Sequence, residues 1–126
     1  MVAVAPPLLS DRPPEIPQKA GFGDRFHYFR GGSGRRYLFT LVSGDALADF
    51  RSVVAMLAEP APSGRLSART VVTVDGRGRI GPVADLAWPP LADRQTLCLV
   101  HLLAASEAER RAVVADLASV AMQLAA

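Results

Sequence analysis

"RFHYFRGGSGRRYLF", residues 25–39, holds a Gly-Gly-Ser-Gly segment between two stretches of aromatic and other apolar residues. The flanking stretches 26–29 and 36–42 are rich in the aromatic and β-branched residues that are typical of β-strands. Glycine adopts the backbone conformations that a tight turn requires, so the segment 31–34 predicts the turn of a β-hairpin. This hairpin decides the fold class, because the rest of the chain has to extend its sheet or cover one of its faces.

A helix is predicted directly after the hairpin. Ser43 and Asp45 are residue types that favour the N-cap position. The apolar residues that follow at helical spacing are Leu47, Phe50, Val54 and Leu57. Pro60 and Pro62 are expected to end this helix, because proline cannot donate a backbone hydrogen bond. The segment 58–68 is therefore expected to be a loop.

The next part of the chain predicts three strands. The segment 70–74 is rich in β-branched residues, a turn is expected at 75–78, and 79–86 returns as a weaker strand. Pro82 places that weaker strand at an edge or a bulge of the sheet. The segment 96–103 is almost continuously apolar, which indicates a central strand that is buried on both faces.

A capping box marks the start of a final helix. Ser106 is the predicted N-cap, and Glu109 follows it at the spacing of the box. The apolar face of this helix is predicted to hold Val113, Val114, Leu117, Val120, Ala121 and Leu124. The expected fold is thus α+β, with a two-layer ββ-α-βββ-α arrangement, a mostly antiparallel sheet and both helices packed on one face.

An internal similarity accompanies this arrangement. The segment 51–57 matches 111–117 at an offset of 60 residues, and at the same offset 37–42 falls on 97–102. One interpretation is a duplicated strand-helix unit. The other is that Ala, Val and Leu coincide in any two amphipathic helices. In either case the helix-free face of the sheet is either exposed to solvent or covered, and a partner, a second copy of the chain or the N-terminal segment could supply the cover.

The N-terminal residues 1–24 differ in composition from the rest, because they hold five of the ten prolines. Proline disfavours helices and central strands, so an extended arm is expected here, followed by a single α+β domain at 25–126. The arm is either a leader without fixed structure or a segment that docks on a partner. In the second case its apolar anchors are Val2, Val4, Leu8, Leu9 and Ile16.

Composition excludes several classes of protein. The 126 residues are half hydrophobic and suit one globular domain, and a net charge of +2 is too small to indicate nucleic acid by itself. The cations are one lysine and thirteen scattered arginines, which indicates GC-rich, bacterial-like codon usage or a preference for guanidinium chemistry. The single cysteine, Cys98, allows no intramolecular disulfide. With no secretory signal and no apolar run of about 20 residues, a cytoplasmic protein without a membrane span is expected.

Catalytic and cofactor motifs are not found in the sequence. The two histidines, His27 and His101, and Cys98 match no metal-ligand spacing, so no metal and no cofactor are expected. Ser33 lacks the glycine two residues later that a nucleophile elbow needs, since Arg35 stands there. The glycine segment matches neither a phosphate loop nor a dinucleotide-binding motif. No catalytic residue is therefore predicted, although His27 could act as a general base beside a phosphodiester.

The remaining candidate site is a set of arginines near the two hairpin turns. They are Arg25, Arg30, Arg35, Arg36, Arg77 and Arg79, and they form one anion-binding patch if both turns lie at the same edge. Residues predicted to stack on bases or to form an interface are Tyr28, Phe29 and Tyr37. The sequence favours a small non-enzymatic protein-binding or assembly protein, an adaptor or accessory subunit that associates with a protein partner or with itself. The alternative is a nucleic-acid-binding protein or small nuclease that uses the arginine-rich hairpin.

Overall fold

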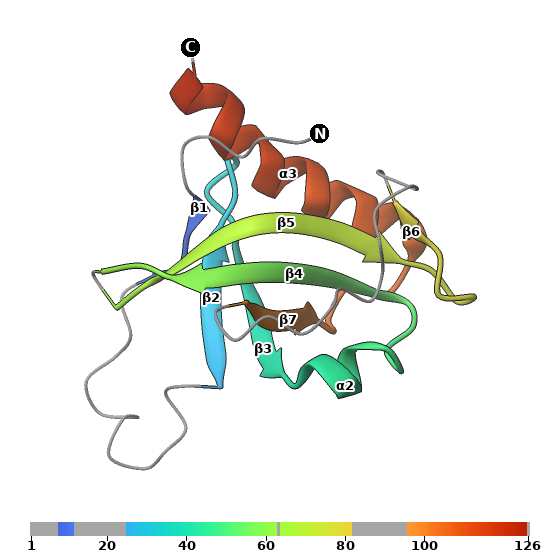
Figure 1. Ribbon diagram of the computed structural model, residues 1–126. Helices are drawn as coiled ribbons and strands as arrows, with labels where there is room; N and C mark the ends of the chain where they lie inside the picture. The colour runs from blue at the N-terminus through green and yellow to red at the C-terminus, as the bar shows by residue number, and fades with distance from the viewer. Residues whose placement is uncertain (1–7, 12–24, 63, 82–95, 126) are drawn as a thin grey trace.

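The computed structural model describes residues 8–11, 25–62, 64–81 and 96–125 (Figure 1). Its strands are β1 (Leu8–Leu9), β2 (Phe26–Arg30), β3 (Arg36–Val42), β4 (Val53–Pro60), β5 (Leu66–Val74), β6 (Ile80–Gly81) and β7 (Leu97–His101). Its helices are α2 (Gly44–Leu47) and α3 (Glu107–Ala125). The parts of the predicted arm at 1–7 and 12–24 lie outside the described residues, as does 82–86 of the predicted weaker strand.

The strands form one antiparallel sheet in the order β1-β5-β4-β7-β3-β2, with β6 paired to β5. An isolated bridge between Ser10 and Phe29 joins the two ends of this order. Beside it, the N–H of Asp11 donates to the carbonyl of Tyr28 at 2.8 Å. The α+β class and the mostly antiparallel sheet are confirmed. The two-layer arrangement is not confirmed, because the sheet curls into a nearly closed barrel.

The predicted hairpin is confirmed as β2 and β3. Phe26 pairs with Thr40 at one end of the ladder, and Arg30 pairs with Arg36 at the other. The turn between them is closed by a hydrogen bond of 2.8 Å from the Gly31 N–H to the Arg35 carbonyl.

The helix predicted over 43–57 is wrong beyond its first turn. Ser43 is the N-cap as expected, but α2 ends at Leu47 and the chain enters β4 at Val53. The residues from Val53 to Met56 are all buried, because β4 lies between β5 and β7 and both of its faces are covered. A strand of this kind has a continuous apolar run, which also contains apolar residues at helical spacing.

The loop predicted at 58–68 is much shorter in the structure. Strand β4 continues to Pro60 and β5 begins at Leu66, so only 61–65 connects them. Leu57 pairs with Thr70 whereas Ala58 pairs with Ala68, which leaves Arg69 as an extra residue in β5. This β-bulge lets Ala68 and Val71, which are three residues apart, pack toward the same core cluster.

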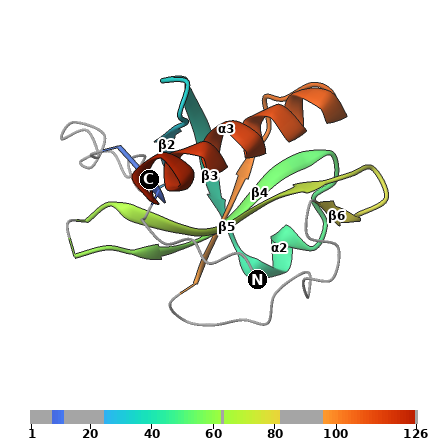
Figure 2. The same cartoon turned by 90° about the horizontal axis from the view of Figure 1, so that it is seen from above.

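The two helices lie on opposite faces of β4, which corrects the prediction that both cover one face. Val54 and Met56 belong to the core cluster that contains Leu117 of α3. Ala55, between them, belongs to a second cluster with Leu47 of α2. Since successive residues of a strand point to opposite faces, α3 covers the barrel interior and α2 lies outside it (Figure 2).

The duplication at the 60-residue offset is not confirmed. Its first copy at 53–57 is part of β4, whereas 113–117 is part of α3.

The start of α3 follows the prediction in part, because Ser106 Oγ accepts a hydrogen bond of 3.1 Å from the Glu109 N–H. The Glu109 carboxylate accepts from the Ala105 N–H instead of from Ser106.

Candidate functional site

The tip of the β2–β3 hairpin is bound to helix α3 through Asp116. The Asp116 carboxylate accepts hydrogen bonds from the Ser33 N–H at 2.8 Å, the Ser33 hydroxyl at 2.6 Å and the Tyr37 hydroxyl at 2.7 Å. The Asp116 carbonyl accepts a further bond of 3.0 Å from the Gly32 N–H. The glycine-rich tip therefore surrounds an anion, and this anion is a carboxylate of the same chain.

The close packing at this contact explains the glycine at position 31, where a Cβ would overlap the Asp116 carboxylate. Partial burial opposes the charge on Asp116, but the hydrogen bonds from Ser33 and Tyr37 and the nearby Arg35 outweigh it and lower the pKa of Asp116. Burial and the bond to Asp116 raise the pKa of Tyr37. We call Ser33, Tyr37 and Asp116 the tip–helix contact.

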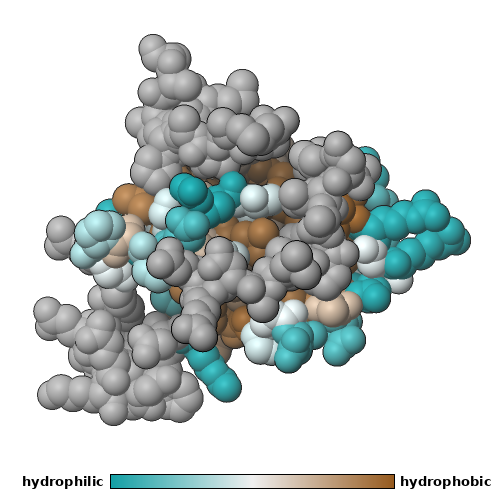
Figure 3. Space-filling model, in the orientation of Figure 1, coloured by the Kyte–Doolittle hydropathy of each residue, from teal (hydrophilic) through white to brown (hydrophobic). Residues whose placement is uncertain are grey.

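The predicted arginines do not form a single patch. Ser33 at the first tip contacts Asp116, whereas Asp75 and Arg79 at the β5–β6 turn line the same hollow as Glu107. Asp116 follows Glu107 by nine positions on the helix, about 13 Å along the axis. Figure 1 shows the two turns at different ends of α3, and in Figure 3 hydrophilic side chains project at the end of the molecule where the β5–β6 turn lies.

The arginines of the first hairpin are also divided. Arg30 and Arg36 pair across the strands next to the tip, but Arg25 lies at the far end, where its carbonyl accepts from Leu41. Arg36 is held in place, because its Nε is 2.8 Å from an Asp11 carboxylate oxygen and its guanidinium lies 4.3 Å from the centre of the Tyr28 ring.

The three predicted stacking or interface residues have different environments. The Phe29 ring is completely buried in the barrel interior, so it is a core residue and not the stacking or interface residue that was predicted. Tyr37 is partly buried and is engaged by Asp116. Tyr28 is 41% exposed and points outward together with Phe26, which is 43% exposed. Phe26, Tyr28, Arg30, Arg36, Leu38 and Thr40 share this outward side of the ladder, which we call the β2–β3 outer face.

His101 has a structural position. It is only 5% exposed, its ring packs against Tyr37 and Phe39, and its Nδ1 lies 2.8 Å from the Leu38 carbonyl. Because a carbonyl only accepts, Nδ1 carries the proton of this bond. The β3–β7 ladder ends one pair earlier at Thr40 and Val100, so His101 continues the attachment of β3 to β7 with its side chain.

Cys98 is buried, and this burial raises the pKa of its thiol. In the part of the chain that the structure describes, no group of three or more His, Cys, Asp or Glu side chains is placed to hold a metal ion. None of the described helices is long and apolar enough to cross a membrane.

The predicted site residues did not include Phe26 and Asp116, on which these two sites depend. Phe26 carries a usable signal, because it alternates with Tyr28 on one side of a strand. Asp116 carries none, since it stands in an ordinary amphipathic helix and its partner Ser33 is 83 residues away. No protein family, no curated protein and no solved structure matches this chain.

Proposed function

We propose that this protein is a small non-enzymatic assembly protein that associates with itself through the β2–β3 outer face. The observation that supports the proposal is the exposure of Phe26 and Tyr28, at 43% and 41%, on the same side of one strand. Exposed aromatic side chains that are grouped in this way are typical of protein interaction sites. Leu38, which pairs with Tyr28, continues the apolar part of the face on β3.

The area that Phe26 and Tyr28 expose is large enough to support weak self-association. An aromatic side chain offers roughly 200 Å² of surface, so the exposed parts of Phe26 and Tyr28 together present about 170 Å². Burying that area would contribute about 4 kcal/mol before the entropic cost of association. The two rings are therefore anchors, and the strand residues around them would have to supply the remaining interface.

Self-association is tested by light scattering after size exclusion over a range of protein concentrations. The expected result is a mass that rises with concentration in the parent protein and remains that of a monomer in Phe26→Ser combined with Tyr28→Ser. Leu103→Ser is the matched control, because Leu103 is 72% exposed but lies in the β7–α3 connection. A monomeric parent protein at millimolar concentration would contradict the proposal, as would equal association of the double variant.

Single-stranded nucleic acid is the second candidate ligand for the same face. The observation that favours it is the pairing of Arg30 directly with Arg36, which places two arginines side by side although a single carboxylate among the described residues, Asp11, binds Arg36. Tyr28 beside them offers a ring for base stacking. Fluorescence anisotropy with single-stranded RNA and DNA at about 50 mM salt tests this ligand, since electrostatic attraction is strong there.

Binding that weakens with salt is expected, and Arg30→Gln should reduce the salt slope by about 0.7 for one lost phosphate contact. Arg69→Gln, on the distant β-bulge, is the control. If the protein is a nuclease, the RNA or DNA incubated with it in this assay should also be cleaved. Identical anisotropy with and without protein would exclude this second function.

A further inference from the structure

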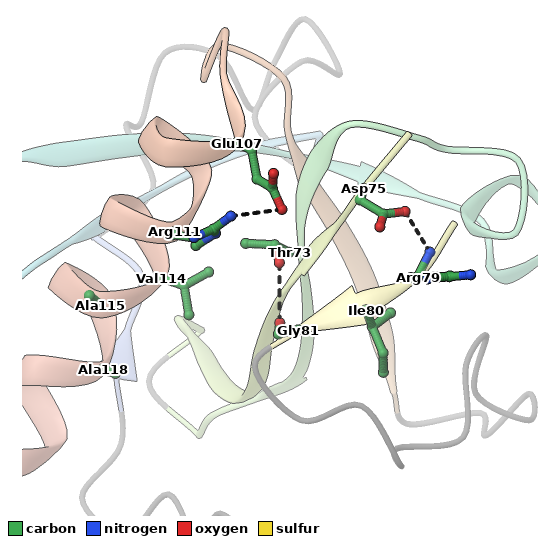
Figure 4. Close-up of a pocket in the computed structure, with 10 residues that line it drawn as sticks. All are labelled: Thr73, Asp75, Arg79, Ile80, Gly81, Glu107, Arg111, Val114, Ala115 and Ala118. Carbon is green, nitrogen blue, oxygen red and sulfur yellow. Dashed lines mark hydrogen bonds and ion pairs between the residues drawn. The ribbon is translucent and has the colours of Figure 1, made fainter. Parts of the chain in front are cut away.

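A hollow of about 420 Å³ lies between α3 and the β5–β6 hairpin, away from the β2–β3 outer face (Figure 4). One wall is formed by α3 and the other by the end of β5, the turn and β6. Its lining residues on α3 include Val114, Ala115 and Ala118, and Ile80 lies on the opposite wall. The hollow exists because these alanines leave open the space that larger side chains would fill.

The hollow has an apolar part and a charged end. Figure 4 shows Val114 and Thr73 directed toward the space between the two walls, with Glu107 and Arg111 above them. The Thr73 hydroxyl is directed to the Gly81 carbonyl at 3.4 Å, so it is not a free polar group facing the space. An occupant would therefore place apolar atoms in the hollow and a polar group near the first turns of α3.

The charges at this end favour an anionic group. Glu107 already accepts from Arg111 at 3.0 Å, and Asp75 accepts from the backbone N–H groups of Arg77 and Arg79. The two carboxylates are thus engaged within the protein. Arg111 retains further N–H donors beyond this one bond, because a guanidinium has five.

The β5–β6 turn adds positive charge on the other side of the hollow. Among the described residues, no side chain forms a hydrogen bond or an ion pair with the Arg79 guanidinium. Arg51 also belongs to this end, since its guanidinium lies against Gly78 in the turn. The lining itself holds two arginines and two carboxylates, and the preference for an anion arises because both carboxylates are already engaged within the protein.

We propose that this hollow binds a small amphipathic anion, an aliphatic chain that carries one carboxylate. The chain would lie against Ile80, Val114 and Ala118, and the carboxylate would bind the free donors of Arg111. Arg79 would attract the ligand across the opening without having to contact it. This site is independent of the β2–β3 outer face and of self-association.

The test is a titration of the full chain with octanoate, followed by ¹H–¹⁵N NMR shifts of the residues that line the hollow. In the series from hexanoate to decanoate, affinity should rise about fourfold for each added methylene while the chain still fits. Octanol and octylammonium should bind more weakly than octanoate. Tighter binding of octylammonium would overturn the proposal, since it would make Glu107 the binding group.

Substitutions on α3 test whether octanoate binds in the hollow. Ala118→Trp should fill the hollow and abolish binding, whereas Ala112→Trp, an exposed alanine of α3 outside the hollow, should leave it unchanged. Arg111→Gln should weaken octanoate about tenfold without affecting octanol. Saturable octanoate shifts that survive Ala118→Trp, or no shifts at millimolar ligand, would refute the site. The comparison of the three ligands uses the unmodified protein and stays decisive if a variant does not fold.

Discussion

Replacing Asp116 by alanine is expected to destabilise the protein by about 2 kcal/mol. The change removes three hydrogen bonds to the carboxylate, two from Ser33 and one from the Tyr37 hydroxyl. A net contribution of about 1 kcal/mol for each bond gives roughly 3 kcal/mol. The higher helix propensity of alanine offsets about 0.5 kcal/mol of this loss. The three hydrogen bonds are partly exposed, which lowers the expected loss of stability further. The bond from Gly32 to the Asp116 carbonyl should persist, because the backbone is unchanged.

Urea unfolding measures this effect as a lower midpoint with an unchanged m-value, and Tm should fall by about 8 °C. Tyr37→Phe should cost about 1 kcal/mol alone and almost nothing in the Asp116→Ala background, because both changes remove the same bond. Asp49→Ala, at an exposed position, is the control and should stay within about 0.5 kcal/mol. Equal effects of Tyr37→Phe in both backgrounds would refute the tip–helix contact as a stabilising unit.

Acid should remove the same stabilisation. The pKa of Asp116 is lowered in the folded protein, so its contribution is complete above the ordinary value of 3.8 and is lost as pH falls through the lower folded value. The stability difference between the parent and Asp116→Ala should therefore be constant near neutral pH and shrink below about pH 4. A difference that grows on acidification would show that the sign of the pKa shift is wrong.

The remaining predictions concern Tyr37, Gly31 and Cys98. Ultraviolet titration of the phenols should find one that ionises above the usual pKa of 10, Tyr37, and its stabilisation should be lost as pH rises through that higher value. Gly31→Ala should destabilise by about 1–3 kcal/mol because its methyl group meets the Asp116 carboxylate, whereas Gly76→Ala, with ordinary space around it, should be tolerated. Cys98 should react with a thiol reagent only as fast as the protein opens, since burial raises its pKa; rapid reaction of the folded protein would contradict this.

Local signals explain what the sequence predicted correctly. The glycines at 31–34 specify a turn between two strand-like stretches, and Ser106 specifies a helix start, so the β2–β3 hairpin and α3 were predicted. The stretch that became β4 has no such signal. Its run from Val53 is apolar on both sides because one core cluster covers each face, and most residues of these clusters are distant from β4 in sequence. Barrel closure through Ser10 is likewise a nonlocal contact.

The candidate site was predictable only in part for a similar reason. Successive side chains of a strand point to opposite sides, which places Phe26 and Tyr28 on one side of β2 and Phe29 on the other. This rule does not determine which side faces the core. The direction depends on α3, which covers the side that holds Phe29. The partner of the glycine-rich tip, Asp116, could not be found from spacing, because a carboxylate in an exposed helix turn is ordinary.

The junction at Ser10 gives the barrel a seam. The Ser10 hydroxyl accepts from the Leu66 N–H at 2.7 Å, and its carbonyl accepts from Arg65 Nε at 2.6 Å. Among the described residues, β5 and β2 are joined by this two-residue strand, by the backbone and side-chain bonds of Ser10, and by the contacts of Asp11 with Tyr28 and Arg36. If the seam opens, two strand edges become available at once, and the β1 segment of one molecule can close the barrel of another. Any tag or fusion placed just before Leu8 therefore acts directly on this seam.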